Sequence, residues 1–300
     1  VYFHNCCCSY VLLTQTLTIS STGVNYNSKL SGHLYNSDWM KSIPDNTPVS
    51  AITIPGTHKS LSLSGLPNFV CQVWTLDKQL HVGLRFFDIH TAIWFPHQLP
   101  YIQDSNWILW KRITFQDVLK TIFKFLETHK DETVLMKITI HGIVQDKIVN
   151  MLEKQISKHK DQIWTELSVP NMAQARGKIV LLQSPTFHHG AENQKSFFFR
   201  NNKLINVEDR IQKLRSHLCD HHFVLTDNAV AWYHSPKTLA EKVNKQIYDL
   251  VKEHKKSSLN QGCLGIFSMN FPSADLIKHI TEIKPCSCGG EPEPTEPEPE

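Results

Sequence analysis

A histidine and an arginine that could act together on a phosphate ester stand near the ends of two predicted strands. His58 follows the β-branched run 51–54 and a Pro-Gly pair, which predicts a loop just past the end of a strand. Arg85 lies in a second predicted strand, 84–89. Chemistry in α/β folds gathers at the carboxyl ends of parallel strands. There an arginine could hold the phosphate oxygens while a histidine moves a proton.

Helices and strands alternate along the predicted chain. The predicted strands cover residues 51–54, 84–89, 133–140, 178–183, 223–226 and 263–269. The predicted helices cover 71–81, 114–128, 145–159, 209–219 and 235–254, and residues 273–282 close the domain. Thr114 is a suitable N-cap for the second of these helices. Such alternation predicts a parallel α/β architecture, and periodicity alone leaves the choice between a barrel and an open sheet undecided.

The two ends of the chain differ from its middle in composition. Residues 1–44 show no sustained periodicity, so we expect an N-terminal extension, either the remnant of a signal sequence or an irregular segment. Residues 284–300 form a tail rich in Glu and Pro, which is typical of an extended, disordered spacer. The middle, 45–283, is expected to be a single domain. The apolar N-terminal patch favours a secreted protein, with a cytoplasmic one as the alternative.

Composition and charge narrow the class of partner. Hydrophobic residues make up 41% of the chain and charged residues 20%, which suits a globular domain with a substantial core. The net charge is +3 without a dense basic run, so nucleic acid is not expected as a partner. The eight cysteines include no CxxC pair and no zinc-ligand spacing. No structural metal is therefore expected, and disulfide pairing is left open.

Six short motifs occur in a fixed order along the chain. They are IPGTH at 54–58, GLRFFDIH at 83–90, TFQDVL at 114–119, DETVLMK at 131–137, RGKIV at 176–180 and GIFSMNFP at 265–272. Each motif is weak alone, and the ordered series resembles the X domain of phosphatidylinositol-specific phospholipase C, in its compact, single-domain form. The resemblance implies an irregular TIM-type barrel, a phosphodiester substrate, peripheral contact with a membrane and, as in the bacterial type, no metal or other cofactor.

The resemblance also implies roles for single residues. His58 matches the general base of the family, and Arg85 is assigned as the arginine that stabilises the phosphate. Three further positions depart from the family pattern. Lys59 replaces an aspartate, Asn106 replaces the histidine that acts as general acid, and Asn270 replaces the aspartate that orients the base. Because an amide cannot act as an acid at neutral pH, proton transfer is expected to be impaired.

Two functional hypotheses follow, and they leave open whether the chain is a working enzyme. In the first, it is a weak or inactive phosphodiesterase that still binds a phosphorylated head group through Lys59, Arg85 and Lys137 beside His58. In the second, it cleaves phosphatidylinositol or a related diester, with His58 as base and a relocated acid. His97, in the same loop as Asn106, is a candidate for that acid.

Other polar residues of the motifs are interpreted as structural. Asp88 and His90 are expected to support the fold. An ion pair between Arg85 and Asp88 is disfavoured, because residues three apart on a strand face opposite sides. Lys137 has two alternatives: it either points into the barrel or lies on the side that faces the helices. The pair His221-His222 is expected in a solvent-exposed loop.

Overall fold

Eight parallel strands form the centre of the molecule in the computed structural model, which describes residues 22–64, 70–93, 101–102, 113–142, 144–195, 199–200, 203–204, 207–227, 235–256 and 262–288. In spatial order the strands are β5 (Ile163–Trp164), β6 (Ile179–Leu182), β4 (Val134–Gly142), β2 (Phe86–Ile93), β1 (Ile54–Thr57), β11 (Ile266–Met269), β10 (Phe223–Asp227) and β7 (Asn193–Lys195). A parallel bridge between Leu182 and Ala191 links β6 to the segment that enters β7. The sheet is thus curled into an irregular TIM-type half-barrel, as predicted.

Short additional strands lie outside this path. β3 (Tyr101–Ile102) pairs antiparallel with β2, and β8 (Phe199–Arg200) pairs with β9 (Lys203–Leu204). These strands, together with β5 and β7, are two or three residues long. Such short segments carry too little periodicity for a sequence pattern to reveal them.

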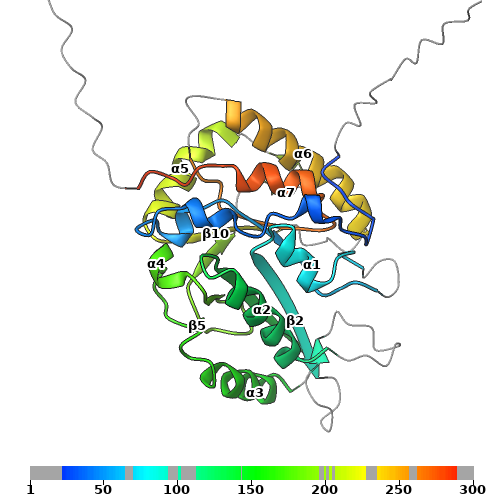
Figure 1. Cartoon of the computed structure of the whole chain (residues 1–300), viewed down its shortest axis with the longest axis vertical. Helices are drawn as coiled ribbons and strands as arrows, with labels where there is room; N and C mark the ends of the chain where they lie inside the picture. Colours follow the sequence, from blue (N-terminus) through cyan, green and yellow to red (C-terminus); the bar gives the residue numbers. More distant parts are fainter. Residues whose placement is uncertain are drawn as a thin grey trace, which may run out of the picture.

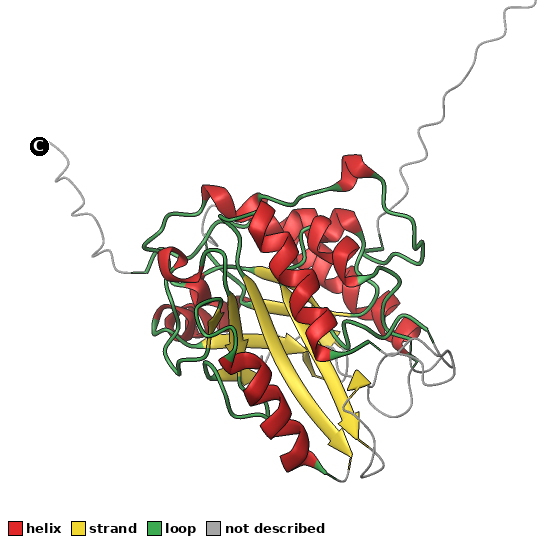
Figure 2. Cartoon of the chain, turned by 60° about the horizontal axis from the view of Figure 1, so that its bottom comes forward, coloured by secondary structure: helices red, strands yellow, loops and turns green. Residues whose placement is uncertain are grey.

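Helices cover the outside of the curled sheet (Figure 2). They are α1 (Leu76–His81), α2 (Phe115–Thr128), α3 (Gln145–Ser157), α4 (Met172–Ala175), α5 (Val207–Cys219), α6 (Pro236–Lys256) and α7 (Ala274–Thr281), with short 3-10 turns at η1 (Gly32–Leu34), η2 (Trp39–Ser42) and η3 (Val49–Ala51). Thr114 caps α2 as predicted, and Asp117 completes a capping box with it. Helices α6 and α7 lie side by side (Figure 1), and both contribute to one apolar cluster with β11.

The first strand corrects the sequence prediction. The predicted strand 51–54 ended at a Pro-Gly turn, whereas β1 runs through Pro55 and Gly56 and ends at Thr57. Gly56 is needed there because a Cβ at this position would lie 2.5 Å from the Cβ of Phe86 on the neighbouring strand. The glycine therefore permits close strand packing instead of a turn, and His58 follows the strand directly.

Two disulfides fasten the end of the described chain to the barrel. Cys219 at the end of α5 is bonded to Cys288, and Cys263 before β11 is bonded to Cys286. The backbone N–H of Cys286 also donates to the carbonyl of Ala51. Residues 284–288 therefore belong to the fold, which corrects the prediction that the disordered tail begins at 284.

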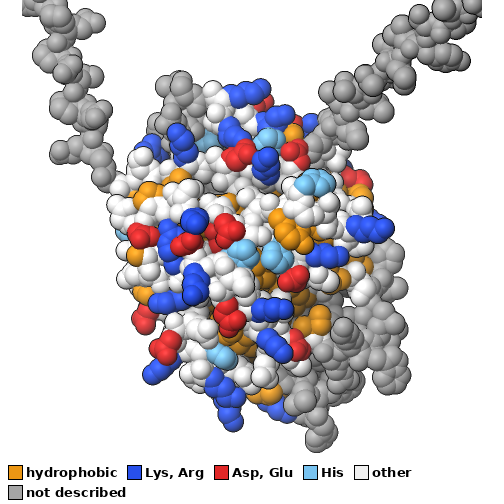
Figure 3. Space-filling view, viewed as in Figure 1, with side chains coloured by type: hydrophobic (Ala, Val, Ile, Leu, Met, Phe, Trp, Pro, Cys, Tyr) orange, Lys and Arg blue, Asp and Glu red, His pale blue; other side chains and the backbone are white. Residues whose placement is uncertain are grey.

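On the face in Figure 3, basic and acidic side chains are interspersed. Among the described residues, the helices are all too short or too polar to span a bilayer. The N-terminal segment from residue 22 packs against the barrel: the N–H of Asn25 donates to the carbonyl of Phe271, and the N–H of Met40 donates to Glu132.

Candidate functional site

Inward-facing residues of neighbouring strands build the candidate site. One buried apolar cluster contains a residue from each of β2, β4 and β10, namely Phe86, Leu135 and Leu225. Because side chains of a strand alternate between its faces, residues two positions later share the same face. Those residues are Asp88, Lys137 and Asp227. The same three strands thus supply an apolar floor and, one pleat closer to their carboxyl ends, a cluster of charges.

His58 is enclosed by two carboxylates of this cluster. The residue is 6% exposed. Its Nδ1 atom lies 3.1 Å from Oδ1 of Asp227 and 3.3 Å from Oδ2 of Asp88. Both carboxylates face the same ring nitrogen, which can present only one hydrogen to them. Nε2 is therefore the atom left to serve a ligand.

The backbone around His58 is held by its neighbours. The N–H of His58 donates to the carbonyl of Met269 at 2.9 Å, and the Gln72 amide donates to the carbonyls of both residues. Lys59 adopts a φ of 43°, in the left-handed region that a side chain rarely occupies. This strained residue next to His58 is fixed in part by the bond from the N–H of Ser60 to the carbonyl of Asp88.

Lys137 supplies a second cation inside the barrel. Its Nζ atom lies 3.3 Å from Oδ1 of Asp88 and 3.7 Å from Oδ2 of Asp227. Of the two alternatives from the sequence, the inward orientation is therefore correct. Asp88 and Asp227 each contact both cations, Lys137 and His58.

A pair of histidines extends the cluster along β2 and β4. Nε2 of His90 lies 2.9 Å from Oδ2 of Asp88, and Nδ1 of His90 lies 2.9 Å from Nε2 of His141. The chain of contacts thus runs from His58 through Asp88 and His90 to His141. Asp88 and His90 were expected to support the fold, and the structure places Asp88 beside His58 and His90 beside Asp88.

The carboxylates and cations stabilise one another's charges. Burial alone would lower the pKa of His58, but Asp227 and Asp88 outweigh burial and raise it to about 9. Burial likewise opposes the charge of Lys137, and the same carboxylates raise its pKa. Burial opposes ionisation of Asp88 and Asp227 too. Interactions with His90 and Lys137 nevertheless hold the pKa of Asp88 below its usual range, and His58 does the same for Asp227. The cluster is therefore ionised at neutral pH.

Three of these residues have side chains that commonly bind metal ions. His58, Asp88 and His90 offer one ligand atom each, all within 4.8 Å of one another. However, the ammonium of Lys137 already lies beside Asp88, where it would repel a cation. We therefore interpret these contacts as an ion-pair network in which Lys137 supplies the positive charge.

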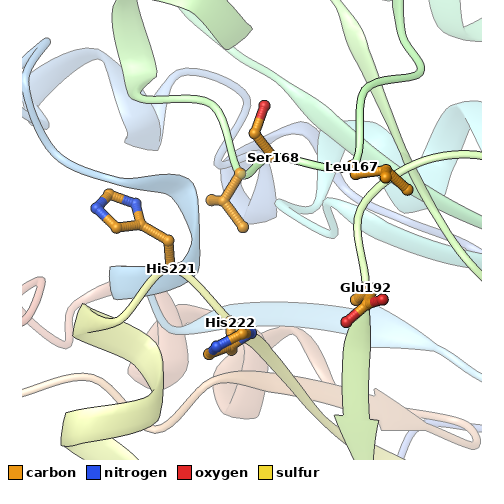
Figure 4. A pocket seen from close by; sticks show the side chains of 6 residues that line it. Leu167, Ser168, Glu192, His221 and His222 are labelled. Carbon is orange, nitrogen blue, oxygen red and sulfur yellow. The ribbon is translucent and has the colours of Figure 1, made fainter.

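A pocket of about 510 Å³ lies elsewhere (Figure 4). It is lined by Leu167, Ser168, Val169, Glu192, His221 and His222. Glu192 precedes β7 and the two histidines precede β10, so the pocket lies at the amino-terminal ends of the strands. His58 and its partners lie at the opposite ends. As predicted, His221 is exposed, and His222 is half-buried.

Comparisons with known proteins agree on one family. The family model described as phosphatidylinositol-specific phospholipase C, X domain, matches residues 46–185. A 1-phosphatidylinositol phosphodiesterase of Listeria monocytogenes is 24% identical over 290 residues, covering 85% of this chain and 87% of the relative.

The chain is therefore similar to the X-domain family of phosphatidylinositol-specific phospholipase C, and the family match covers residues 46–185.

Solved structures support the same fold. The phosphatidylinositol-specific phospholipase C of L. monocytogenes superposes with a TM-score of 0.63 at 21% identity, covering 83% of this chain and 99% of the bacterial one. A modified phosphatidylinositol-specific phospholipase C of Staphylococcus aureus gives a TM-score of 0.60 at 15% identity, covering 84% of this chain and 99% of the other. At such identities the likeness establishes the fold alone.

Arg85 does not lie with His58. It is fully buried, and its Nε atom donates to Oε2 of Glu132 at 2.8 Å. The guanidinium also donates to the backbone carbonyls of Ser37, Leu80 and Leu84 and lies over the ring of Phe125. These contacts are on the side of β2 that faces the helices. The prediction that Arg85 binds the phosphate is therefore corrected.

The other departures from the family pattern fall in different places. Asn270 follows β11 and is fully buried. The carboxylates against His58 come from Asp88 and Asp227, so His58 has acidic partners although residue 270 is an amide. Lys59 directly follows His58 and is half-buried. Asn106 and His97 lie outside the described residues.

Sequence reasoning missed Asp227 and His141. Asp227 ends a short strand, and its alignment with Asp88 depends on strand order, which the sequence does not give. A signal was available for His141, because Lys137, Thr139 and His141 alternate along one strand and must share a face. The correct inward assignment of Lys137 would have brought His141 to the site.

Proposed function

We propose that the chain binds the phosphodiester head group of a phosphoinositide or a related lipid and cleaves it slowly at neutral pH, with His58 as the base. The observation that carries this proposal is the position of His58 between Asp88 and Asp227, beside Lys137. Two carboxylates fix the ring through Nδ1, and Nε2 remains available to accept a proton from an attacking hydroxyl.

Two cations of the cluster, His58 and Lys137, could contact a bound anion. With His58 protonated, two cations face two carboxylates, so the cluster carries no net charge from these four residues. A phosphodiester would meet the Nε2–H of His58, and the ammonium of Lys137 would attract its charge. Lys59, next to His58, adds a further positive charge nearby.

The same arrangement predicts slow turnover at neutral pH. With a pKa of about 9, only about one His58 in a hundred is neutral at pH 7 and able to act as a base. The protonated majority binds the phosphate without accepting a proton. Hydrolysis should therefore rise with pH up to about 9, because each pH unit below the pKa costs about tenfold in base.

The relatives support the substrate class. The similar protein of L. monocytogenes is named a 1-phosphatidylinositol phosphodiesterase. We propose that this chain acts on the same substrate class and meets it at a membrane. The alternative of a binding protein without turnover shares the same pocket and differs in one observable, the release of a soluble phosphorylated head group.

Hydrolysis of phosphatidylinositol vesicles between pH 6 and 10 tests the proposal. We expect slow release of the phosphorylated head group that rises toward pH 9 and is lost in His58→Ala. The matched control is His33→Ala, an exposed histidine far from the cluster in sequence, which should behave as the parent. A parent that binds the vesicles and releases nothing at any pH would establish the binding protein instead. Turnover retained in His58→Ala would refute His58 as the base.

A further inference from the structure

The His90–His141 pair has a polarity that depends on its protons. Asp88 accepts hydrogen bonds when ionised, so Nε2 of His90 must carry a hydrogen to bond to it at 2.9 Å. The other nitrogen of His90, Nδ1, faces Nε2 of His141 at 2.9 Å. Of these two facing nitrogens, one must carry a hydrogen and the other must accept it. Two arrangements satisfy these conditions.

In the neutral arrangement, His90 has no hydrogen left for Nδ1, so Nε2 of His141 donates. The outer nitrogen of His141, Nδ1, then carries only a lone pair. In the second arrangement, the pair holds one extra proton: His90 donates from both nitrogens, and His141 accepts through Nε2. Nδ1 of His141 then carries a hydrogen. One proton therefore converts the outer nitrogen from an acceptor into a donor.

We propose that His90 and His141 form a proton-switched grip for a phosphate oxygen of the head group, in which the pair binds the anion through Nδ1 of His141 only when it holds one extra proton. Asp88 stabilises the protonated His90, and the anion stabilises the donor form of His141. The pair thus adds a contact beside His58 and Lys137 and links ligand binding to proton uptake. This inference rests on the proposed function of the site.

The charged groups around the pair define what can titrate with it. From β2, Asp88 contacts His90, and from the segment after β1 the His58 ring lies 5.7 Å from the His90 ring. Lys137 of β4 and Asp227 of β10 reach the pair only through Asp88 and His58.

His141 is half-buried. Burial lowers its pKa most, and the charges of His90 and Lys59 lower it further, to about 4. Because His58 and Lys137 both have raised pKa values, they are already protonated at pH 7. Any proton taken up on binding at that pH must therefore come to the pair.

Calorimetry with a soluble diester tests the grip. The probe is the 2-deoxy analogue of glycerophosphoinositol, which lacks the attacking hydroxyl and carries one constant charge between pH 5.5 and 8. Titrations in buffers with different ionisation enthalpies count the protons taken up. For the parent we expect uptake that approaches one proton per diester as the pH rises, and an affinity that falls by up to about tenfold per pH unit.

Two variants separate a switch from a structural role. His141→Gln offers an amide donor that does not titrate, so it should bind the diester with no proton uptake and with an affinity independent of pH. His189→Gln is the matched control: this partly exposed histidine pairs with Glu153 of α3 and should behave as the parent.

Three outcomes would overturn the proposed role of the His90–His141 pair. Diester binding by the parent without proton uptake at any pH would refute it and leave the proposed function intact, as would His141→Gln with the parent's uptake. No binding of the diester to the parent would refute both.

Discussion

Two buried ion-pair clusters share strand β2, and only one of them can serve a ligand. Arg85 and Glu132 lie on the face toward the helices, each with 0% exposure. There the guanidinium of Arg85 donates hydrogen bonds to Glu132 and to three backbone carbonyls. Asp88, three residues later and on the opposite face, joins a cluster in which Nε2 of His58 and Nδ1 of His141 are left over. A buried charge indicates a functional site when its hydrogen-bonding groups are not all used by the protein.

Breaking the Arg85–Glu132 pair should have the largest effect, and on stability. Arg85→Met leaves Glu132 buried without its partner, so the free energy of unfolding should fall by about 3–5 kcal/mol. Denaturant unfolding measures this loss. The double variant Arg85→Met/Glu132→Leu removes both charges and should recover much of the stability.

The distinction between a structural and a ligand-binding cluster would be wrong if Arg85 belonged to the site around His58. Arg85→Met would then weaken diester binding in the folded protein while changing the unfolding free energy little. If Arg85 is structural, the folded fraction of Arg85→Met binds the diester as the parent does.

The alternation of side chains along a strand let the sequence predict part of the difference between the Arg85–Glu132 pair and the Asp88 cluster. The sequence correctly placed the main strands and helices, the capping of α2 by Thr114 and the position of His58 after the first strand. It also placed Arg85 and Asp88 on opposite faces. The wrong choice was which face looked inward, because an arginine suggests a phosphate more readily than a buried partner does, and Glu132 is 47 residues away from Arg85.

Contacts between strands that are far apart in the chain could not be predicted from the sequence. Asp227 meets His58 because β10 pairs with β11 and β11 with β1, an order that only the fold determines. The disulfides are similar: Cys219 and Cys288 are 69 residues apart, and spacing alone did not select this pairing. Local chemistry was predictable, whereas partners supplied by long-range topology were not.

The second-largest effect is expected in the pH dependence of stability, to which the cluster around His58 should contribute. The pKa of His58 rises from 6.5 to about 9 on folding, so its stabilisation is fully present below pH 6.5 and is lost as the pH rises through 9. The 2.5-unit shift corresponds to about 3 kcal/mol at most. Unfolding measured at pH 6 and at pH 9.5, in the parent and in His58→Gln, gives this contribution as the difference between the two proteins. Equal pH dependence in both would contradict the ion pairing of His58.

Removing one carboxylate from His58 should have a smaller and more specific effect. Asp227 is the strongest influence that raises the pKa of His58, so Asp227→Asn should lower it, with the amide still able to accept a hydrogen bond. The loss of one charge at 3.1 Å should move the midpoint of the pH–hydrolysis profile down by about one unit.

Glu132→Gln provides the contrast to Asp227→Asn, since it neutralises a buried carboxylate on the other face of the sheet. Its folded fraction should keep the parent's midpoint. If both variants move the midpoint equally, the two faces of β2 are electrostatically coupled, and the division of this barrel into a structural and a chemical cluster would be wrong. A shift confined to Asp227→Asn means that the pKa of His58 is set by the carboxylates beside its Nδ1 atom.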